Sequence, residues 1–255
     1  MKKKVIAIIS ILILACVTIL TFTTKSEGFT QYQNGLTWYY EVVDGEAVNV
    51  YVYSGTPSTT VTIPTKLGGY PVTSIIGEKF GYTQYNIFGK NNSSYNYSGK
   101  VEKIIIPDTV NTIGNYAFAE CSSLTSVMIG NSVTTIGNHA FDSCSSLTSV
   151  TIGNSVTTIG AGAFEYCHRL ISVTIPDSVT TIGEWAFYEC SSLISVTIPD
   201  SVTTIGDAAF AYCSSLTSVT IPDSVTMIGD KAFDGSESLK SITFQGDAPR
   251  VTSAG

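Results

Sequence analysis

The sequence predicts an α/β repeat solenoid: a right-handed array with a parallel β-sheet face and short helical or irregular outer turns. Two observations predict it. Apolar and aromatic residues return every 23 positions, and a cysteine marks the same place in five successive units. A single unit is too small to bury its own apolar face, so neighbouring units have to stack into a continuous core.

Three residue types carry the 23-residue step. They are the cysteines Cys121, Cys144, Cys167, Cys190 and Cys213, the phenylalanines Phe118, Phe141, Phe164, Phe187, Phe210 and Phe233, and the leucines Leu124, Leu147, Leu170, Leu193, Leu216 and Leu239. Within 101–255, six full units span 101–238 and a partial seventh begins at Leu239. A degenerate first repeat lies in 61–100, where Val61-Thr62-Ile63-Pro64 matches the strand of later units.

The unit at 216–233 illustrates how one repeat is expected to fold. Its Leu-x-x-Val-x-Ile segment places alternate residues of a short strand inward. Pro222 then ends the strand because proline cannot donate a hydrogen bond within a sheet. The next apolar pair, Val225 and Ile228, is expected to enter the same core from the returning side of the coil.

The second half of each unit is expected to be a compact outer turn. Gly229 is predicted to take a tight turn, and the following Ala-Phe pair, with cysteine three positions later, predicts one short helical turn. The repeat cysteines could be buried free thiols, disulfides between neighbouring units, or metal ligands. Parallel, inward-pointing side chains and an odd number favour free thiols.

These motifs resemble the BspA-like class of leucine-rich repeats over about 60–255. The resemblance is carried by Leu-x-x-Val-x-Ile-Pro, Val-x-x-Ile-Gly, Ala-Phe and Cys-x-x-Leu at fixed offsets. Two units carry Gly130 and Gly153 in place of the proline, and Ser236 replaces the cysteine of the last full unit. The resemblance implies an extended surface protein that binds other macromolecules, and it implies no shared enzymatic activity. We expect no cofactor.

Residues 1–26 predict a signal peptide or a membrane or lipid anchor. Three lysines follow Met1, and residues 5–22 are apolar apart from Ser10, Thr18 and Thr21. This is the pattern of an export signal, and its length just reaches that of a membrane span. Cleavage after Ser26, retention as an anchor, and lipidation of Cys16 in a lipobox-like Ile-Leu-Ala-Cys segment all remain open.

Residues 27–60 do not repeat and are expected to form an N-terminal β cap. Two alternating segments flank Asp44-Gly45, which is typical of a β-hairpin turn. A solenoid needs its first core face covered, and a hairpin here supplies that cover. The alternative is a ligand site built on Trp38 and the neighbouring tyrosines.

A Tyr/Asn-rich insertion over 81–100 interrupts the degenerate first repeat. Ten of the fourteen tyrosines precede residue 101. Tyrosine mixed with Ser, Gly and Asn is typical of adaptable binding loops, whereas a bland insertion is the simpler interpretation. The candidate binding residues are Tyr82, Tyr85, Tyr95 and Tyr97.

The exposed side of the predicted strands carries two ladders of small hydroxyls. These candidate binding residues are Ser149, Thr151, Ser172, Thr174, Ser195, Thr197, Ser218 and Thr220. Threonine also suits a strand on its own account, so the ladders are either ordinary strand chemistry or a binding face. A flat hydroxyl array of this kind could also bind a glycan or order water against ice.

Charge and chemistry exclude several functions. Residues 26–255 hold nine Lys or Arg and twenty Asp or Glu, a balance of 9 − 20 = −11. Clustered cations are absent after Lys4, which argues against nucleic acid and against membrane contact except through the N-terminal segment. His139 and His168 do not repeat and are expected at the surface, with no catalytic pair and no metal spacing.

The sequence therefore predicts a secreted or cell-surface module that binds an extracellular protein or glycan and performs no catalysis. The alternative is a structural solenoid that acts as a spacer and presents other regions of the chain.

Overall fold

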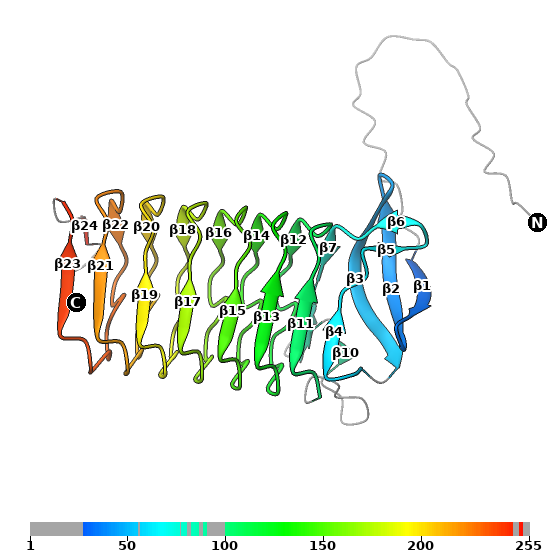
Figure 1. Ribbon diagram of the computed structural model, residues 1–255, viewed down its shortest axis with the longest axis horizontal. Helices are drawn as coiled ribbons and strands as arrows, with labels where there is room; N and C mark the ends of the chain where they lie inside the picture. Colours follow the sequence, from blue (N-terminus) through cyan, green and yellow to red (C-terminus); the bar gives the residue numbers. More distant parts are fainter. Residues whose placement is uncertain are drawn as a thin grey trace, which may run out of the picture.

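The computed structural model describes residues 28–55, 57–76, 78–80, 83–86, 89–90, 100–246 and 250–251. The 23-residue units form a row of stacked coils, with antiparallel strands at the N-terminal end (Figure 1). Two parallel sheets run the length of this row, so the fold is a β-solenoid.

The first parallel sheet contains one strand from each coil. In spatial order it runs β23-β21-β19-β17-β15-β13-β11-β4. The strands are β4 (Thr60–Thr62), β11 (Lys103–Ile106), β13 (Ser126–Ile129), β15 (Ser149–Thr151), β17 (Ser172–Thr174), β19 (Ser195–Thr197), β21 (Ser218–Ile221) and β23 (Ser241–Phe244). Between neighbouring units the register is one whole repeat: Val150 pairs with Val173, and Val173 pairs with Val196.

A second parallel sheet, which the sequence analysis did not predict, is built from two-residue strands on the returning side of each coil. They are β7 (Ser74–Ile75), β12 (Thr112–Ile113), β14 (Thr135–Ile136), β16 (Thr158–Ile159), β18 (Thr181–Ile182), β20 (Thr204–Ile205), β22 (Met227–Ile228) and β24 (Arg250–Val251). Their isoleucines up to β22 enter the core, as expected for Val225 and Ile228, which are 3 % and 7 % exposed. The same residues also form a hydrogen-bonded wall.

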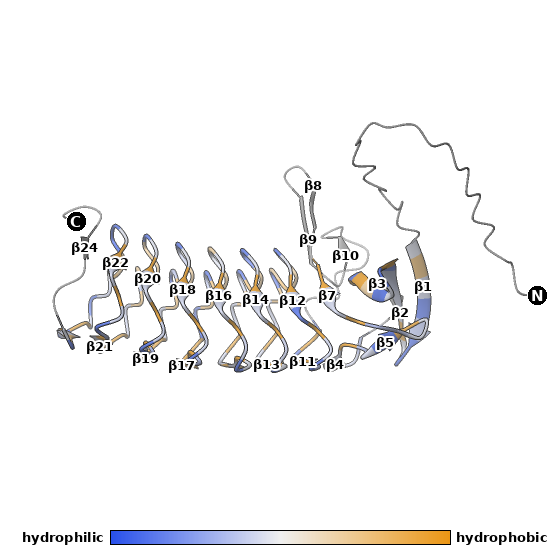
Figure 2. Cartoon of the chain, turned by 90° about the horizontal axis from the view of Figure 1, so that it is seen from above, coloured by the Kyte–Doolittle hydropathy of each residue, from blue (hydrophilic) through white to orange (hydrophobic). Residues whose placement is uncertain are grey.

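The core is a set of side-chain ladders that run along the solenoid axis. Six phenylalanines from Phe118 to Phe233 stack face to face with ring centroids 5.0–5.6 Å apart. Figure 2 shows hydrophobic segments returning at the same place in each coil. Each unit therefore shields the apolar face of its neighbour, as the repeat pattern predicted.

The predicted helical turn is wrong, and with it the α/β class: the described residues contain no helix. At the Ala-Phe segment, Trp185 and Glu189 take left-handed φ values of 54°, which interrupt a right-handed helix. The amides of Trp185, Phe187 and Glu189 donate to carbonyls 22 residues later, at 2.8–2.9 Å, while the amides between them close turns to the carbonyl three residues earlier.

The spacing of the coils explains why a helix does not form. A helix with its side chains is about 10–12 Å wide, whereas neighbouring strands lie about 4.7–4.9 Å apart. A helix in every unit would force the coils apart on this side. Alternating turns let the backbone of each coil bond directly to the backbone of the next. The outer turns of the units thus form a third wall of the solenoid, in which neighbouring coils have the same spacing as in the two sheets.

A glycine follows the second-sheet strand in each full unit, at the same position of the repeat. This glycine column has a different role from the one expected. A turn follows Gly229 over residues 230–235, as expected, but Gly229 itself does not take a left-handed conformation, so the turn is not what requires glycine here. A Cβ atom at Gly183 would lie 2.7 Å from the backbone of Ala161 and Gly160 in the preceding coil. Glycine is needed here because successive backbones approach closely.

The N-terminal strands form the predicted β cap. β2 (Leu36–Val43) and β3 (Glu46–Gly55) make an antiparallel hairpin, and β1 (Gly28–Gln33) adds a third strand. Asp44 and Gly45 have φ values of 51° and 82°, as an Asp-Gly hairpin turn requires. β3 pairs with β7, so the cap continues the second sheet.

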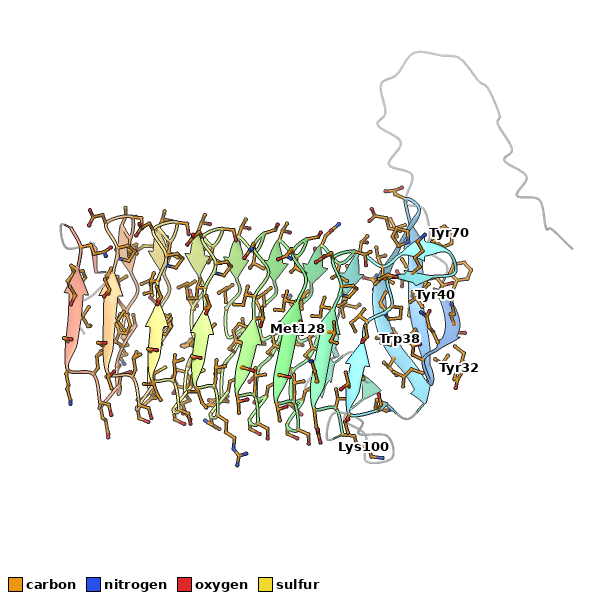
Figure 3. The ribbon with its side chains drawn as sticks, in the orientation of Figure 1. Tyr32, Trp38, Tyr40, Tyr70, Lys100 and Met128 are labelled. Carbon is orange, nitrogen blue, oxygen red and sulfur yellow. The ribbon has the colours of Figure 1, made fainter. Side chains whose placement is uncertain are left out.

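Trp38 belongs to the core of the cap. Its side chain is fully buried, and Nε1 donates to the Gln33 carbonyl at 3.3 Å. Figure 3 shows Trp38 inside the cap and Tyr32 at the outer edge. Trp38 is therefore not available to a ligand, so the alternative of a site built on Trp38 and the neighbouring tyrosines is wrong for Trp38 itself.

The remaining strands are short. A two-stranded sheet joins β5 (Lys66–Leu67) and β6 (Tyr70–Pro71). Directly before and within the insertion, β8 (Glu78–Phe80), β9 (Thr83–Asn86) and β10 (Gly89–Lys90) form a three-stranded antiparallel sheet. No helix that could span a membrane occurs in the part of the chain that the structure describes.

Candidate functional site

The strand face is the outward side of the first parallel sheet from β13 to β21. The eight predicted hydroxyl residues, Ser149 through Thr220, are all exposed there. The Val residues between them are buried, at 7 % exposure or less. Neighbouring hydroxyls lie in register, so that Ser172 pairs with Ser195 and Thr174 pairs with Thr197. The ladders expected from the sequence are therefore two straight rows on one uncharged surface.

Large apolar side chains are also exposed at this face. Met128 in β13 is 46 % exposed and projects outward where the units from β15 to β21 carry threonine (Figure 3). Ile171 and Ile194, directly before β17 and β19, are 49 % and 50 % exposed. They belong to adjacent coils, because the Ile194 amide donates to the Ile171 carbonyl at 3.0 Å. The surface thus combines hydroxyls with apolar anchors.

The five repeat cysteines are buried free thiols, as predicted. Four of them donate a hydrogen bond to the carbonyl of a phenylalanine 26 positions earlier; Cys190 Sγ, for example, lies 3.3 Å from the Phe164 oxygen. Ser236 stands at the cysteine position of the last unit and makes the same bond to Phe210 at 3.0 Å. The position therefore requires a small donor as well as a small buried side chain.

Burial should make these thiols unreactive in the folded protein. Burial raises the pKa of Cys213 to about 12 from the ordinary 9.0, and it raises the pKa of Cys190 well above that value. Since the thiolate is the reactive form, a Cys16→Ser chain is expected to show no labelling by iodoacetamide at pH 8 and five labelled thiols in denaturant. Rapid labelling of the native protein, measured by mass spectrometry, would contradict the buried ladder.

A second exposed surface was missed by the sequence analysis. Tyr166, Tyr188 and Tyr212 come from successive coils on the third wall and meet edge to face, with centroids 5.6 Å and 5.4 Å apart. Trp185, on the same wall, is 43 % exposed. The three tyrosines occupy two adjacent columns of the repeat, so only the three-dimensional stacking brings them together.

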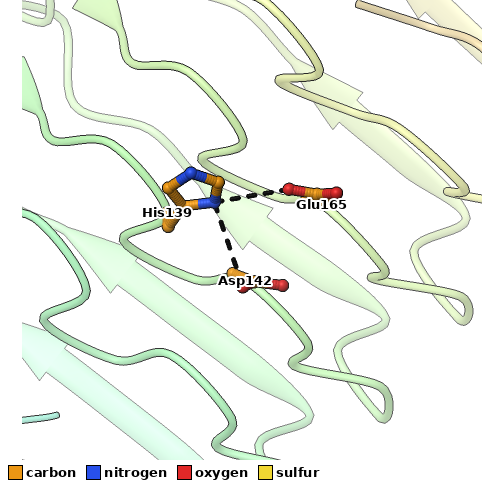
Figure 4. A group of neighbouring side chains, drawn as sticks. All are labelled: His139, Asp142 and Glu165. Atoms are coloured by element: carbon orange, nitrogen blue, oxygen red, sulfur yellow. Dashed lines mark ion pairs between the residues drawn. The ribbon is translucent and has the colours of Figure 1, made fainter. Parts of the chain in front are cut away.

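The third wall also holds a mixed cluster of one imidazole and two carboxylates (Figure 4). His139 Nδ1 lies 3.3 Å from Glu165 Oε2 and 3.9 Å from Asp142 Oδ2. The three side chains are only 24 %, 15 % and 13 % exposed, respectively. His139 is thus partly buried, and the expectation of an ordinary surface histidine is wrong.

Burial and neighbouring charge both act on Asp142. Burial raises its pKa most strongly, and the nearby carboxylates of Glu165 and Glu120 raise it further. The Ser143 hydroxyl, which donates to Asp142 Oδ1 at 2.8 Å, and His139 act in the opposite direction. The cluster therefore concentrates negative charge in a place where water offsets little of it.

The structure leaves the predicted site residues of the insertion and the N-terminal segment untested. Tyr82, Tyr95, Tyr97 and Cys16 lie outside the described residues, and Tyr85 lies in β9 with no described side chain. His168 is exposed, as expected, with Nδ1 3.0 Å from the Glu189 carbonyl. A binding role for the tyrosine-rich insertion stays a prediction.

Stacked 23-residue coils with inward leucine, phenylalanine and cysteine ladders define a leucine-rich-repeat solenoid. The family model for the BspA type leucine rich repeat region matches residues 90–213 and 134–254, with six copies. No curated protein matches the chain.

Two solved structures of bacterial repeat proteins are similar. A leucine-rich repeat protein from Bacteroides ovatus is 31 % identical over 84 % of this chain, with a TM-score of 0.66. This chain spans about half of that protein, 53 % of its length. The leucine-rich repeat protein of T. pallidum is 25 % identical over 82 % of this chain and 90 % of its own, with a TM-score of 0.69.

The chain belongs to the BspA-type leucine-rich repeat family. Membership of this family is consistent with a protein-binding or structural repeat module.

Proposed function

We propose that this chain is an exported, cell-surface or secreted module that binds an extracellular protein through the strand face. The observation that carries the proposal is the composition of that face. Its outward positions from β13 to β21 carry serine, threonine and one methionine and no charged residue, and Met128, Ile171 and Ile194 supply exposed apolar area.

Physical chemistry favours association at such a surface. Burying a charge without a partner is far more costly than burying a hydroxyl that finds a hydrogen bond. Methionine is enriched at protein interfaces and adapts to the shape of its partner. A sheet that is rigid before binding also loses little conformational entropy on association. The strand face combines these three properties.

Export is proposed from the N-terminal sequence. Residues 1–26 carry the basic start and apolar run of an export signal. The proposal includes no catalytic step and no cofactor.

The test is a binding screen of residues 27–255 against extracellular-matrix proteins, with a glycan array in parallel. A Thr174→Lys/Thr197→Lys pair places two charges on the strand face. It is expected to weaken protein binding by about tenfold or more, because each buried, unpaired charge is costly. The matched control, Thr180→Lys/Thr203→Lys, alters the same two repeats at exposed positions beside the second sheet and should leave binding unchanged.

Three outcomes would contradict the proposal in different ways. If the strand-face lysine pair and the control lysine pair weakened binding equally, the strand face would not be the specific binding site. Loss only on deletion of 81–100 would move it to the tyrosine-rich insertion. No binding by a folded, monodisperse sample would leave the spacer role as the better account.

A further inference from the structure

His139, Asp142 and Glu165 come together because of the repeat. His139 and Asp142 are three positions apart in one coil, and Glu165 occupies the column of Asp142 one coil later, 23 residues on. Other coils carry Ala119, Tyr188, Ala211 and Asp234 in that column. The described residues therefore place two carboxylates in neighbouring rungs beside a histidine at this point of the array.

Neighbouring like charges need a compensating positive charge. Carboxylates directly opposite one another in adjacent strands or rungs are destabilising, and partial burial makes the repulsion stronger. Glu120 adds a further negative charge near Asp142. His139 supplies at most one positive charge, and only when it is protonated. The cluster therefore has the electrostatic character of a site for a dication.

We propose that His139, Asp142 and Glu165 bind one divalent transition-metal ion of the zinc class. The three ligand atoms lie within 4.8 Å of one another. Zinc bonds of about 2.0–2.2 Å to nitrogen and oxygen place tetrahedral ligands about 3.3–3.6 Å apart. The 3.3 Å between His139 Nδ1 and Glu165 Oε2 already has this value, whereas the 3.9 Å to Asp142 Oδ2 and the remaining carboxylate separation, within 4.8 Å, have to shorten by side-chain rotation when the ion binds.

The surroundings of the His139 imidazole suit a metal ligand. His139 Nδ1 is buried and has no hydrogen-bond partner among the described residues, even though both carboxylates face it. The ring stacks on Tyr116 at 5.1 Å with an interplanar angle of 7°, which fixes its plane. Ser143 holds Asp142 through the opposite carboxylate oxygen. Such supporting contacts commonly orient metal ligands.

Gly162 makes room for the ring in the next coil. It stands in the column of His139, where other units carry Trp185, Ala208 and Lys231. A Cβ atom at Gly162 would lie 2.4 Å from His139 Nδ1 and 2.9 Å from Glu165 Oε2. A side chain there would occupy the space between the ligand atoms. Glycine at 162 thus leaves the cluster open to an ion.

The ligand set favours zinc over calcium. Imidazole is a good ligand for zinc and neighbouring transition metals, whereas calcium takes six to eight oxygen ligands. Three protein ligands leave a fourth tetrahedral position for water. This metal site is independent of the strand face, because its residues lie on the third wall.

The experiment is a calorimetric titration of the full chain, carrying Cys16→Ser, with ZnCl2 and separately with CaCl2. One Zn²⁺ per chain and a Zn²⁺-dependent rise in Tm are expected, with weaker or no Ca²⁺ binding. Glu165→Gln keeps the shape of the side chain and should weaken Zn²⁺ binding by about tenfold or more. His139→Ala should do the same, while His168→Ala, the matched control in the next coil, should leave it unchanged.

Each contrary result overturns the proposal. If folded protein takes up no Zn²⁺, the cluster is only a histidine–carboxylate ion pair. If Zn²⁺ binding survives Glu165→Gln and His139→Ala, the ion binds elsewhere. If Ca²⁺ binds more tightly than Zn²⁺, the zinc-class assignment is wrong. Circular dichroism of each variant separates lost metal binding from lost folding.

Discussion

Replacing Phe187 with alanine is expected to lower the free energy of unfolding by about 3–5 kcal/mol. Phe187 is fully buried in the middle of the phenylalanine ladder, between Phe164 at 5.3 Å and Phe210 at 5.2 Å. Its removal deletes two ring contacts and leaves a cavity that the stacked coils cannot fill without losing register. The effect is therefore larger than the loss of one apolar side chain from a deformable core.

Urea denaturation monitored by circular dichroism measures this change. Thr197→Ala on the strand face serves as the control, since an exposed residue away from special features should shift stability by no more than about 0.5 kcal/mol. If Phe187→Ala behaved like the control, the ladder would contribute little to stability. A second, earlier transition in the variant would show that the array unfolds in segments, as a one-dimensional stack allows.

Replacing Gly183 with alanine is expected to destabilise the solenoid by about 1–3 kcal/mol. At a glycine with ordinary φ, this change usually stabilises a protein by about 0.4–1 kcal/mol through the unfolded state. Here the sign should be reversed, because the new Cβ atom would lie 2.7 Å from backbone atoms of Ala161 and Gly160. Two coils would have to separate to accept one methyl group.

The neighbouring Glu184→Ala provides a matched control, since Glu184 is exposed and the change removes atoms instead of adding them. Thermal unfolding of both variants under the same conditions is the measurement. A Tm for Gly183→Ala at or above that of the parent chain would refute the close-approach explanation and favour a purely conformational role for the glycine column.

Residues with a long-range repeat could be predicted from the sequence, and residues defined by contacts between coils could not. The Leu, Val, Ile and Phe positions return every 23 residues, so their common burial and register follow from stacking alone. The Ser/Thr rows follow from strand alternation. The hairpin at Asp44-Gly45 follows from its turn chemistry.

Two features of the fold could not be predicted from the sequence, for different physical reasons. Strands such as Thr181–Ile182 contain two residues, too few for any periodic pattern. At the outer turn, the spacing of Ala, Phe and Cys suits a helix locally, and only the width of a helix against the distance between coils excludes it. Tertiary packing therefore decided the structure of that wall.

The proposed metal-binding cluster could have been found from the sequence only by comparing residues separated by one repeat length plus a few positions. His139 and Glu165 are 26 residues apart, which is one repeat plus three. Residues at that separation face one another on the third wall, as the cysteine-to-phenylalanine bonds also show for the core. A search for local metal motifs does not examine such distances.

The direction of the hydrogen bonds has a mechanical consequence. In both parallel sheets and in the third wall, the bonds between coils run along the solenoid axis. Tension applied to the two ends of the array therefore opens one interface at a time instead of shearing many bonds together. Each coil that detaches releases 23 residues, or roughly 75–80 Å of extended chain. Under a steady pull the array would lengthen coil by coil and so limit the force that reaches whatever it holds.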